Sequence, residues 1–581
     1  MSWTPSARRK GQRQTEAVAV ALLHVLGFPF TLSTAAIPEV PLVLTSGLGM
    51  TVSAASTRQQ LRSANPVIGE DTMRPARLLA GLVVAVALLA SASVRARENW
   101  PMYGRNLLHT FSNDASRINP GNVAKLKPLW TFSTTDAISA SPTVVDDVLY
   151  VGSWDGFFYA LDARSGVLIW KFQVDCDNTI VPVPPQCLAP GQTPPPRFFS
   201  QGGLITSTAA VVDGQVYFAA GKTVYDLNAA DGSLRWKHVI CGNPEEPNCA
   251  SDANDPTQIF SSPAVFGGMV FIGHTAGAVG YRGGIEALDA KDGTQRWRFE
   301  VDPILNADGQ PILGPGGHAI GGYNLGCGAV WSSAAVDVDL HLVFFGTADC
   351  NRDPTPPYHE AILALDAESG LLASAYRPPH LLNGCDQDFG ASPNLISFGG
   401  RRYIGEGGKN GTYYLLERAS LNLVWARNVV FGGSIGGFYG ASFDGRRIFA
   451  ATSLGDGNIA TKTGLCNPSN PRDLFLQEPS MHAFAVRDGT ILWEKTQNHS
   501  VAPTSIANGV VFSGLVGIEG FGLNAYHAQT GRRLTQLPLK GSVNSAATPL
   551  GKQLFVTAGT SVDGTDSGVF TFALPSKEPD D

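Results

Sequence analysis

The sequence is poor in charge and lacks the short motifs of several common protein classes. Asp, Glu, Lys and Arg make up only 16% of its 581 residues, and the formal net charge is −7. No run of Lys and Arg could bind a nucleic-acid backbone, so we expect no nucleic-acid partner. The sequence has no C-x-x-C pair to suggest zinc and no C-x-x-C-H motif to attach a c-type haem.

Glycine and proline are abundant instead. The chain has 65 Gly and 38 Pro, and 44% of its residues are hydrophobic. This composition is typical of many short strands joined by tight turns, so we expect an all-β fold.

An export signal is predicted inside the chain rather than at its first residue. Met73 is followed by Arg74 and Arg77, by the apolar run Leu78 to Ala90 and by the cleavage-type sites Ala90-Ser91-Ala92 and Val94-Arg95-Ala96, which is the layout of a secretory signal peptide. The run is shorter than the ~20 apolar residues that cross a bilayer, so we expect cleavage, no membrane span in the mature chain, and a periplasmic or extracellular location. We predict four parts: a disordered or over-extended leader at 1–72, the signal peptide at 73–96, one folded domain at 97–575 and a disordered tail at 576–581.

The cysteines agree with an oxidising compartment. All eight follow the predicted signal peptide, and the close pairs Cys176/Cys187 and Cys241/Cys249 are the best disulfide candidates. The sequence leaves open the pairing of the other four, Cys327, Cys350, Cys385 and Cys466.

One pattern recurs along the chain: an apolar strand, a turn that ends in Gly, and a Trp four residues after that Gly. The clearest copies have Gly166 with Trp170, Gly232 with Trp236, and Gly293 with Trp297. The incomplete copies have Gly370 with Ser374, Leu421 with Trp425, Gly489 with Trp493, and Gly531 without a Trp. The Gly supplies a positive φ in the turn, and we expect the Trp to pack against the neighbouring repeat.

The repeats predict an eight-bladed β-propeller. Two alternating β runs precede each copy, which gives about four strands per repeat, the blade of a propeller. The last strands of the chain lack an outer strand, whereas Pro128 to Phe132 is an outer strand without a blade. Joined, they make the eighth blade and remove the open edge of the sheet by closure between the N- and C-terminal strands. Insertions at about 173–203, 240–260, 302–326 and 456–480 are predicted to be loops over a face of the ring.

The Trp repeat, the opening Trp100 to Gly104 and the run Ile118 to Trp130 are similar to a known family. They resemble the quinoprotein alcohol dehydrogenases, which depend on pyrroloquinoline quinone (PQQ), and particularly the members like polyvinyl alcohol dehydrogenase. The resemblance covers about residues 99–575. It implies a PQQ cofactor, an alcohol substrate and transfer of electrons to a separate cytochrome c or another acceptor.

Three residues match family positions that contact the quinone. Trp331 matches the Trp on which the planar quinone stacks, a contact that buries much area at little ordering cost. Lys409, in a Lys-Asn-Gly turn, matches a cation that faces the quinone oxygens and stabilises negative charge there. Thr275 matches a hydroxyl that contacts the quinone carboxylates. Each also has an ordinary structural alternative, as a core Trp, an exposed turn Lys and a strand Thr.

The family's calcium site is only partly matched. Asp349 takes the place of a calcium-binding Asn, and a carboxylate oxygen suits calcium. Ala278 stands where the family has a Glu ligand, and alanine cannot coordinate a metal.

The family's general base is also altered. Thr355 takes the place of the Asp that the resemblance implies, so we name Asp353, two residues earlier, as the catalytic base. His359 and Glu360 follow nearby and are alternatives, since all three side chains can take a proton.

The resemblance favours a quinoprotein oxidoreductase that oxidises an alcohol, of secondary or polymeric type, by hydride transfer to PQQ. The rival is a propeller without enzymatic activity, similar to the scaffold proteins of outer-membrane assembly. Trp331 and Lys409 favour the enzyme, whereas Ala278 and the altered base loop favour the rival, and the fold itself fits both.

Overall fold

The computed structural model describes two units of the chain separately, residues 1–96 and residues 97–581. In the first unit, β1 (Thr31–Leu32), β2 (Val43–Thr45) and β3 (Thr51–Ser53) form a small antiparallel sheet. In the second, the described ranges are 98–176, 205–242, 248, 251, 255–275, 282–301, 329–348, 358–379, 387–430, 432, 436–454, 478–517, 521–559 and 566–575. Within these ranges no helix is long and apolar enough to cross a membrane.

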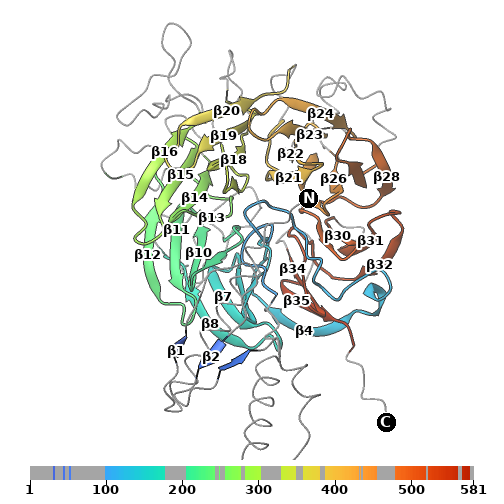
Figure 1. Cartoon of the computed structure of the whole chain (residues 1–581), viewed down its shortest axis with the longest axis horizontal. Helices are drawn as coiled ribbons and strands as arrows, with labels where there is room; N and C mark the ends of the chain where they lie inside the picture. Colours follow the sequence, from blue (N-terminus) through green and yellow to red (C-terminus); the bar gives the residue numbers. More distant parts are fainter. Residues whose placement is uncertain are drawn as a thin grey trace, which may run out of the picture. The chain divides into compact units, whose positions relative to one another are not determined.

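The second unit is an eight-bladed β-propeller, as the repeats predict (Figure 1). Each blade is a four-stranded antiparallel sheet, and we number blades 1 to 8 in chain order. Blade 1 consists of β5 (Thr143–Val145), β6 (Val148–Gly152), β7 (Phe157–Asp162) and β8 (Leu168–Gln173), and blade 2 consists of β9 (Ala210–Val212), β10 (Gln215–Ala220), β11 (Thr223–Asn228) and β12 (Leu234–Val239). Blade 3 consists of β13 (Ala264–Phe266), β14 (Met269–His274), β15 (Gly284–Asp289) and β16 (Gln295–Glu300), and blade 4 consists of β17 (Ala335–Asp337), β18 (Leu342–Gly346), β19 (Ile362–Asp366) and β20 (Leu372–Tyr376). Blade 5 consists of β21 (Asn394–Phe398), β22 (Arg401–Gly407), β23 (Thr412–Glu417) and β24 (Leu423–Asn428). Blade 6 consists of β25 (Gly437–Phe443), β26 (Arg447–Ser453), β27 (Ser480–Ala485) and β28 (Ile491–Thr496). Blade 7 consists of β29 (Ser505–Ala507), β30 (Val510–Leu515), β31 (Gly522–His527) and β32 (Arg533–Leu537).

Blade 8 joins the two ends of the propeller. Its inner strands β33 (Thr548–Leu550), β34 (Gln553–Ala558) and β35 (Gly568–Ala573) come from the end of the chain, and its outer strand β4 (Lys127–Ser133) comes from the beginning. Figure 1 shows blue β4 beside red β35. The predicted closure is therefore confirmed: β4 pairs with β35, which would otherwise be an open edge at the end of the chain.

The repeated Trp docks on the turn glycine of the following blade. Trp170 of blade 1 illustrates the contact: its indole N–H donates to the carbonyl of Ala229 in blade 2 at 3.1 Å, and a Cβ on Gly232 would lie 2.5 Å from its ring. Gly232 has φ +72°, so the turn needs glycine both for its backbone and for the close approach of the ring. Equivalent docks join Trp130 to Gly166, Trp236 to Gly293, Trp297 to Gly370, Trp425 to Gly489, and Trp493 to Gly531.

A second set of contacts links the blades near their first strands. A Ser or Thr just before the first strand of one blade accepts a hydrogen bond from the backbone N–H of the preceding blade. The series runs from Ala546 in blade 8 to Ser141, Thr208, Ser262, Ser333 and Ser392 in blades 1 to 5, with N–O distances of 2.8 to 3.0 Å. These bonds satisfy buried backbone donors, and they hold the first strands of six blades together.

The segment before β4 also links the blades, in a way that the repeats do not predict. Between residues 98 and 117 its backbone bonds in turn to blades 1, 2, 4, 5, 6, 7 and 8. The contacts on the blade side are Val144, Val211, Val336, Leu395, Phe443, Ile506 and Gly551. Trp100 and Phe111 of this segment are fully buried, so the segment is part of the core.

The predicted long insertions lie mostly outside the described residues, as do Cys187, Cys249, Cys327, Cys350, Cys385 and Cys466. Cys176 and Cys241 are described, and both are disulfide-bonded. Their pairing with Cys187 and Cys249 stays a prediction.

The dock can be tested by adding one methyl group under the indole. Gly293→Ala places a Cβ 2.5 Å from the Trp236 ring, whereas Gly214→Ala has a similar φ, +77° against +74°, and meets nothing within 4 Å. We expect Gly214→Ala to lower the free energy of unfolding by roughly 1 kcal/mol through backbone strain alone. Gly293→Ala should lower it by roughly 1–3 kcal/mol more, because the Trp must move. Equal losses for the two variants in denaturant titrations would show that the dock contributes nothing.

Two buried histidines predict sensitivity to acid. Burial lowers the pKa of His109 to about 4 and that of His274 to about 3. The unfolded chain binds these protons near pH 6.5 and the folded chain does not, so stability present above pH 6.5 is lost as the pH falls towards 4. Each group contributes a slope of about 1.4 kcal/mol per pH unit in that window.

His109→Asn isolates one of these groups. The His109 Nδ1–H donates to the carbonyl of Pro393 at 3.1 Å, and the backbone at His109 has φ +52°. Asn can donate the same bond, tolerates the left-handed backbone and does not titrate. Denaturation measured between pH 7 and 4.5 should give a shallower loss of stability for His109→Asn than for the wild type, and parallel curves would contradict the assignment.

Candidate active site

Three charged or aromatic side chains meet where blades 4 and 5 adjoin. Trp331 lies just before β17 of blade 4, Asp388 lies before β21 of blade 5, and Lys409 lies in the turn between β22 and β23 of blade 5. The structure thus brings together Trp331 and Lys409, both predicted to contact the quinone, and adds Asp388, which was not among the predicted residues.

Asp388 is at the centre of this group. Its Oδ2 accepts a hydrogen bond from the Trp331 indole N–H at 3.1 Å and lies 3.1 Å from the Lys409 Nζ. The Lys409 Nζ is in turn 5.1 Å from the centroid of the Trp331 ring, within cation–π range. The Asp388 backbone carbonyl also accepts from the Lys409 N–H at 2.8 Å, so main chain and side chains fix the two residues together.

Glycines without room for a Cβ surround the group. A Cβ on Gly390 would lie 1.7 Å from two carbons of the Trp331 ring, and one on Gly437 of blade 6 would lie 2.6 Å from the Lys409 Cα. The Tyr439 ring, also from blade 6, is centred 6.2 Å from the Trp331 ring at an angle of 50°. Trp331 is therefore held against Gly390, while its half-buried state leaves part of the indole accessible.

Thr275 lies next to this group through the backbone of blade 3. The Val330 N–H donates to the His274 carbonyl at 3.0 Å, which brings the residues that follow, Trp331 and Thr275, to neighbouring positions. The Thr275 hydroxyl donates to the Gln258 carbonyl at 3.3 Å, so its oxygen can still accept a bond from a ligand.

The alternative bases differ from Asp388 in their surroundings. Glu360 has φ +49° and pairs with Arg377 at 3.0 Å, and Arg377 also bonds the His359 carbonyl. His359 is completely buried. These contacts favour a structural role for Glu360. The other predicted residues of this region, Asp349, Asp353, Thr355 and Ala278, lie outside the described residues, and within those residues no group of three or more His, Cys, Asp or Glu could hold a metal.

The group has the donors and acceptors that a planar, anionic ligand with a reactive carbonyl requires. The accessible indole offers a flat apolar surface, the ammonium of Lys409 offers a positive charge beside it, and the Asp388 carboxylate offers a proton acceptor. The residues therefore fit a quinone that carries carboxylates. Asp388 is not predicted from the sequence because the family pattern points to the loop after β18, whereas Asp388 precedes β21 much as Trp331 precedes β17.

Comparison with known proteins agrees with this fit. The family model described as "Glucose/ethanol/alcohol dehydrogenase, beta-propeller domain" matches residues 100–187 and 245–426, which include Trp331, Asp388 and Lys409. A polyvinylalcohol dehydrogenase of Pseudomonas sp is 25% identical over 435 residues, 68% of this chain and 59% of that protein. A quinohemoprotein alcohol dehydrogenase of Comamonas testosteroni is 26% identical over 363 residues, 57% of this chain and 46% of that protein. The chain thus spans about half the length of these curated relatives.

Solved structures share the fold. The quinohemoprotein alcohol dehydrogenase from Comamonas testosteroni superposes with a TM-score of 0.61 at 20% identity and covers 87% of this chain and 85% of that one. A europium-containing methanol dehydrogenase superposes with a TM-score of 0.62 at 18% identity over 82% of this chain and 98% of that one. The family-model match and the similar proteins together support a PQQ alcohol dehydrogenase family for this chain.

Proposed function

We propose that the protein is a quinoprotein dehydrogenase that oxidises an alcohol, of secondary or polymeric type, with PQQ bound against Trp331. The observation that carries the proposal is the contact of Trp331, Asp388 and Lys409, because one site then combines a stacking surface, a cation and a proton acceptor. When bound, PQQ supplies a planar two-electron acceptor for the hydride of the alcohol.

Each side chain has a separate task in this proposal. Trp331 binds one face of the planar group, and Gly390, which lacks a Cβ, leaves the room in which the indole lies against the backbone. Lys409 donates to an oxygen on which negative charge grows during the reaction, and its position is fixed before substrate binds. Thr275 offers an oxygen beside the same surface, for a hydrogen bond to the ligand.

We propose two candidates for the general base: Asp388, which the structure places in the site, and Asp353, which the sequence predicts. Removal of the hydroxyl proton must accompany the loss of hydride, and a carboxylate within hydrogen-bond reach of the alcohol can accept that proton. Asp388 is supported by its contact with both Trp331 and Lys409. Asp353 rests on its place in the sequence alone.

The remaining parts of the proposal come from sequence and from relatives. Calcium bound through Asp349 would polarise the carbonyl that accepts the hydride. Export, with signal-peptide cleavage before residue 97, and a separate electron acceptor complete the proposal. The acceptor is supported by a methanol dehydrogenase of Methylorubrum extorquens, 27% identical over 60% of this chain, whose name includes cytochrome c.

Loss of the stacking surface tests cofactor binding. We expect Trp331→Ala to weaken PQQ binding about 100-fold or more, because the large aromatic contact is removed and a void remains. Trp236→Ala is the matched control: it removes a docking Trp distant in sequence and should lower the melting temperature while leaving PQQ affinity unchanged. Both effects are measured by absorbance titration of the folded proteins with PQQ. If the wild type binds no PQQ with or without calcium, the binding-propeller rival is favoured.

Paired Asn variants distinguish the two candidate bases. Asp388→Asn keeps the size of the side chain but removes the proton acceptor, so we expect kcat to fall about 10²–10⁴-fold with PQQ still bound. Asp353→Asn, measured beside it in quinone-dependent dye reduction, should leave kcat within about threefold of the wild type. The opposite pattern would return the role to Asp353.

A further inference from the structure

The junction between blades 4 and 5 lacks the Trp and the Gly of the dock. Ser374 takes the Trp position of blade 4: it pairs with Ala364 just before a β-bulge, as Trp170 pairs with Ala160. In the facing turn of blade 5, Leu421 replaces the Gly, with φ +54°. Arg418 stands at the position whose backbone carbonyl accepts the indole N–H at other junctions, where the side chain is a small Ala or Val.

An ion-pair cluster occupies this junction instead. The buried Arg418 of blade 5 donates to Asp337 of blade 4 at 2.8 Å and to the carbonyls of Ile396 and Tyr403 in its own blade. Burial opposes ionisation of Asp337, but the Arg418 guanidinium and two backbone N–H groups hold the pKa of Asp337 below its usual value.

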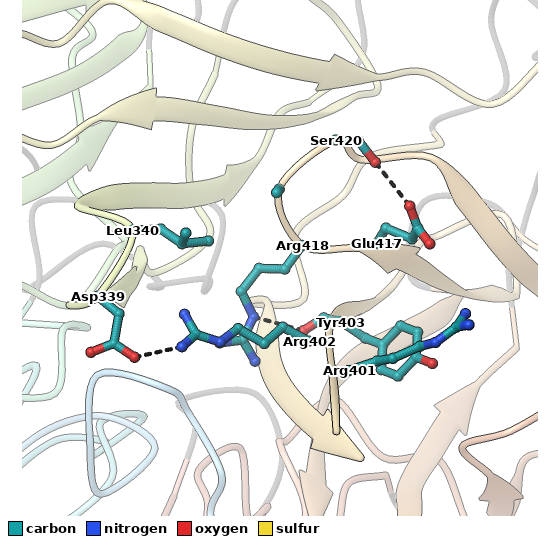
Figure 2. Close-up of a pocket in the computed structure, with 9 residues that line it drawn as sticks. Asp339, Leu340, Arg401, Arg402, Tyr403, Glu417, Arg418 and Ser420 are labelled. Carbon is teal, nitrogen blue, oxygen red and sulfur yellow. Dashed lines mark hydrogen bonds and ion pairs between the residues drawn. The ribbon is translucent and has the colours of Figure 1, made fainter. Parts of the chain in front are cut away.

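A second, exposed pair lies outside the first. Arg402 of blade 5 reaches Asp339 of blade 4 at 2.8 Å (Figure 2). Between the two blades, the turns that carry these residues line a groove of about 680 Å³, with Leu340, Tyr403 and Glu417 among its lining residues. At this edge of the junction a groove with charged lining residues therefore lies where other junctions have an indole, while Leu421 packs in the apolar core that the two blades share.

The candidate site spans these same two blades. Trp331 belongs to blade 4, and Asp388 and Lys409 belong to blade 5. Two hydrogen bonds cross the junction beside them: the Ser333 N–H donates to the Ser392 hydroxyl at 2.8 Å, and the Phe389 N–H donates to the Thr347 carbonyl at 3.0 Å. The Arg418–Asp337 pair lies at the opposite ends of the same strands, because Asp337 ends β17 and Ser333 precedes it.

We propose that Arg418 and Asp337 are positioning residues for the site, and that their ion pair replaces the Trp dock in setting how blade 5 lies against blade 4. With the pair intact, the junction is fixed at both ends of its strands. Without it, the exposed ion pairs of Arg402 with Asp339 and Asp337 remain at that end, as does the apolar packing of Leu421. These contacts include no buried ion pair, so we expect blade 5 to tilt more readily about the bonds beside the site. A tilt changes the distances from Trp331 to Asp388 and Lys409, and sites depend on such distances to within about 0.5 Å.

The test uses amide hydrogen exchange of the whole protein without cofactor. The Ser333 and Phe389 amides report on the junction of blades 4 and 5, and the Thr208 amide, which donates to Ser262, reports on blades 2 and 3. In Arg418→Gln, we expect exchange at Ser333 and Phe389 to accelerate about tenfold or more, with Thr208 unchanged. Asp337→Asn should do the same from the other blade, and it keeps an oxygen for the two backbone N–H groups.

Two controls separate positioning from general loss of stability. Trp236→Phe weakens the dock between blades 2 and 3, so it should accelerate Thr208 and leave Ser333 and Phe389 unchanged. Adding Ser374→Trp and Leu421→Gly to Arg418→Gln supplies the missing ring and its space, and should return exchange at the junction of blades 4 and 5 to near the wild-type rate. Added to the wild type, the same pair should slow that exchange.

The proposal is overturned if Arg418→Gln and Asp337→Asn lower the melting temperature without affecting Ser333 and Phe389. It is also overturned if Trp236→Phe accelerates those two amides equally. The consequence for the cofactor rests on the proposed function: PQQ affinity should fall in Arg418→Gln and return with the added dock. A wild type that binds no PQQ would reject the proposed function, while the exchange data would still decide the role of the ion pair.

Discussion

The stacking of an indole on a glycine of the next blade is the contact on which the ring depends. Trp170 needs a residue without a Cβ beneath it, and Gly232 has both the missing Cβ and the left-handed backbone of the turn. The two residues are therefore useful only as a pair across a blade junction. This dependence explains why Ser374 and Leu421 occur together: once the ring is absent, the glycine is no longer required by it.

Because contacts within and between strands hold the blades together, the loops at one edge are free to carry chemistry. Trp331, Asp388 and Lys409 come from three such loops, and each lies directly beside a strand whose position is already fixed. The Asp388 carboxylate unites them, since one oxygen faces both an indole N–H and an ammonium group. A rigid framework with a polar group of this kind at its edge suits catalysis, because the groups are ordered before substrate binds.

Residues of the candidate site could be predicted from the sequence only where they lie in a recognisable family motif. Trp331 and Lys409 could be proposed from the sequence because each lies in a short pattern with a recognisable family counterpart, and the structure places them side by side. The contact of Asp388 with Trp331 could not be predicted, because the family pattern points to the loop after β18 and nothing local marks one Asp among several as a neighbour of Trp331. The metal ligand Asp349 and the base candidate Asp353 stay predictions, since both lie outside the described residues.

The sequence by itself determined the all-β class, the number of blades, the closure by the first and last strands, and the role of the repeated Trp. All of these follow from local periodicity and turn chemistry, which repeat along the chain and are therefore legible in one dimension. Only the tertiary structure decided that the segment 98–117 bonds to most of the blades, that Asp388 meets Lys409 and Trp331, and that Arg418 pairs with Asp337 where a dock is missing. Such contacts join residues separated by tens to hundreds of positions, and each depends on how far neighbouring blades turn about the ring, which no local pattern encodes.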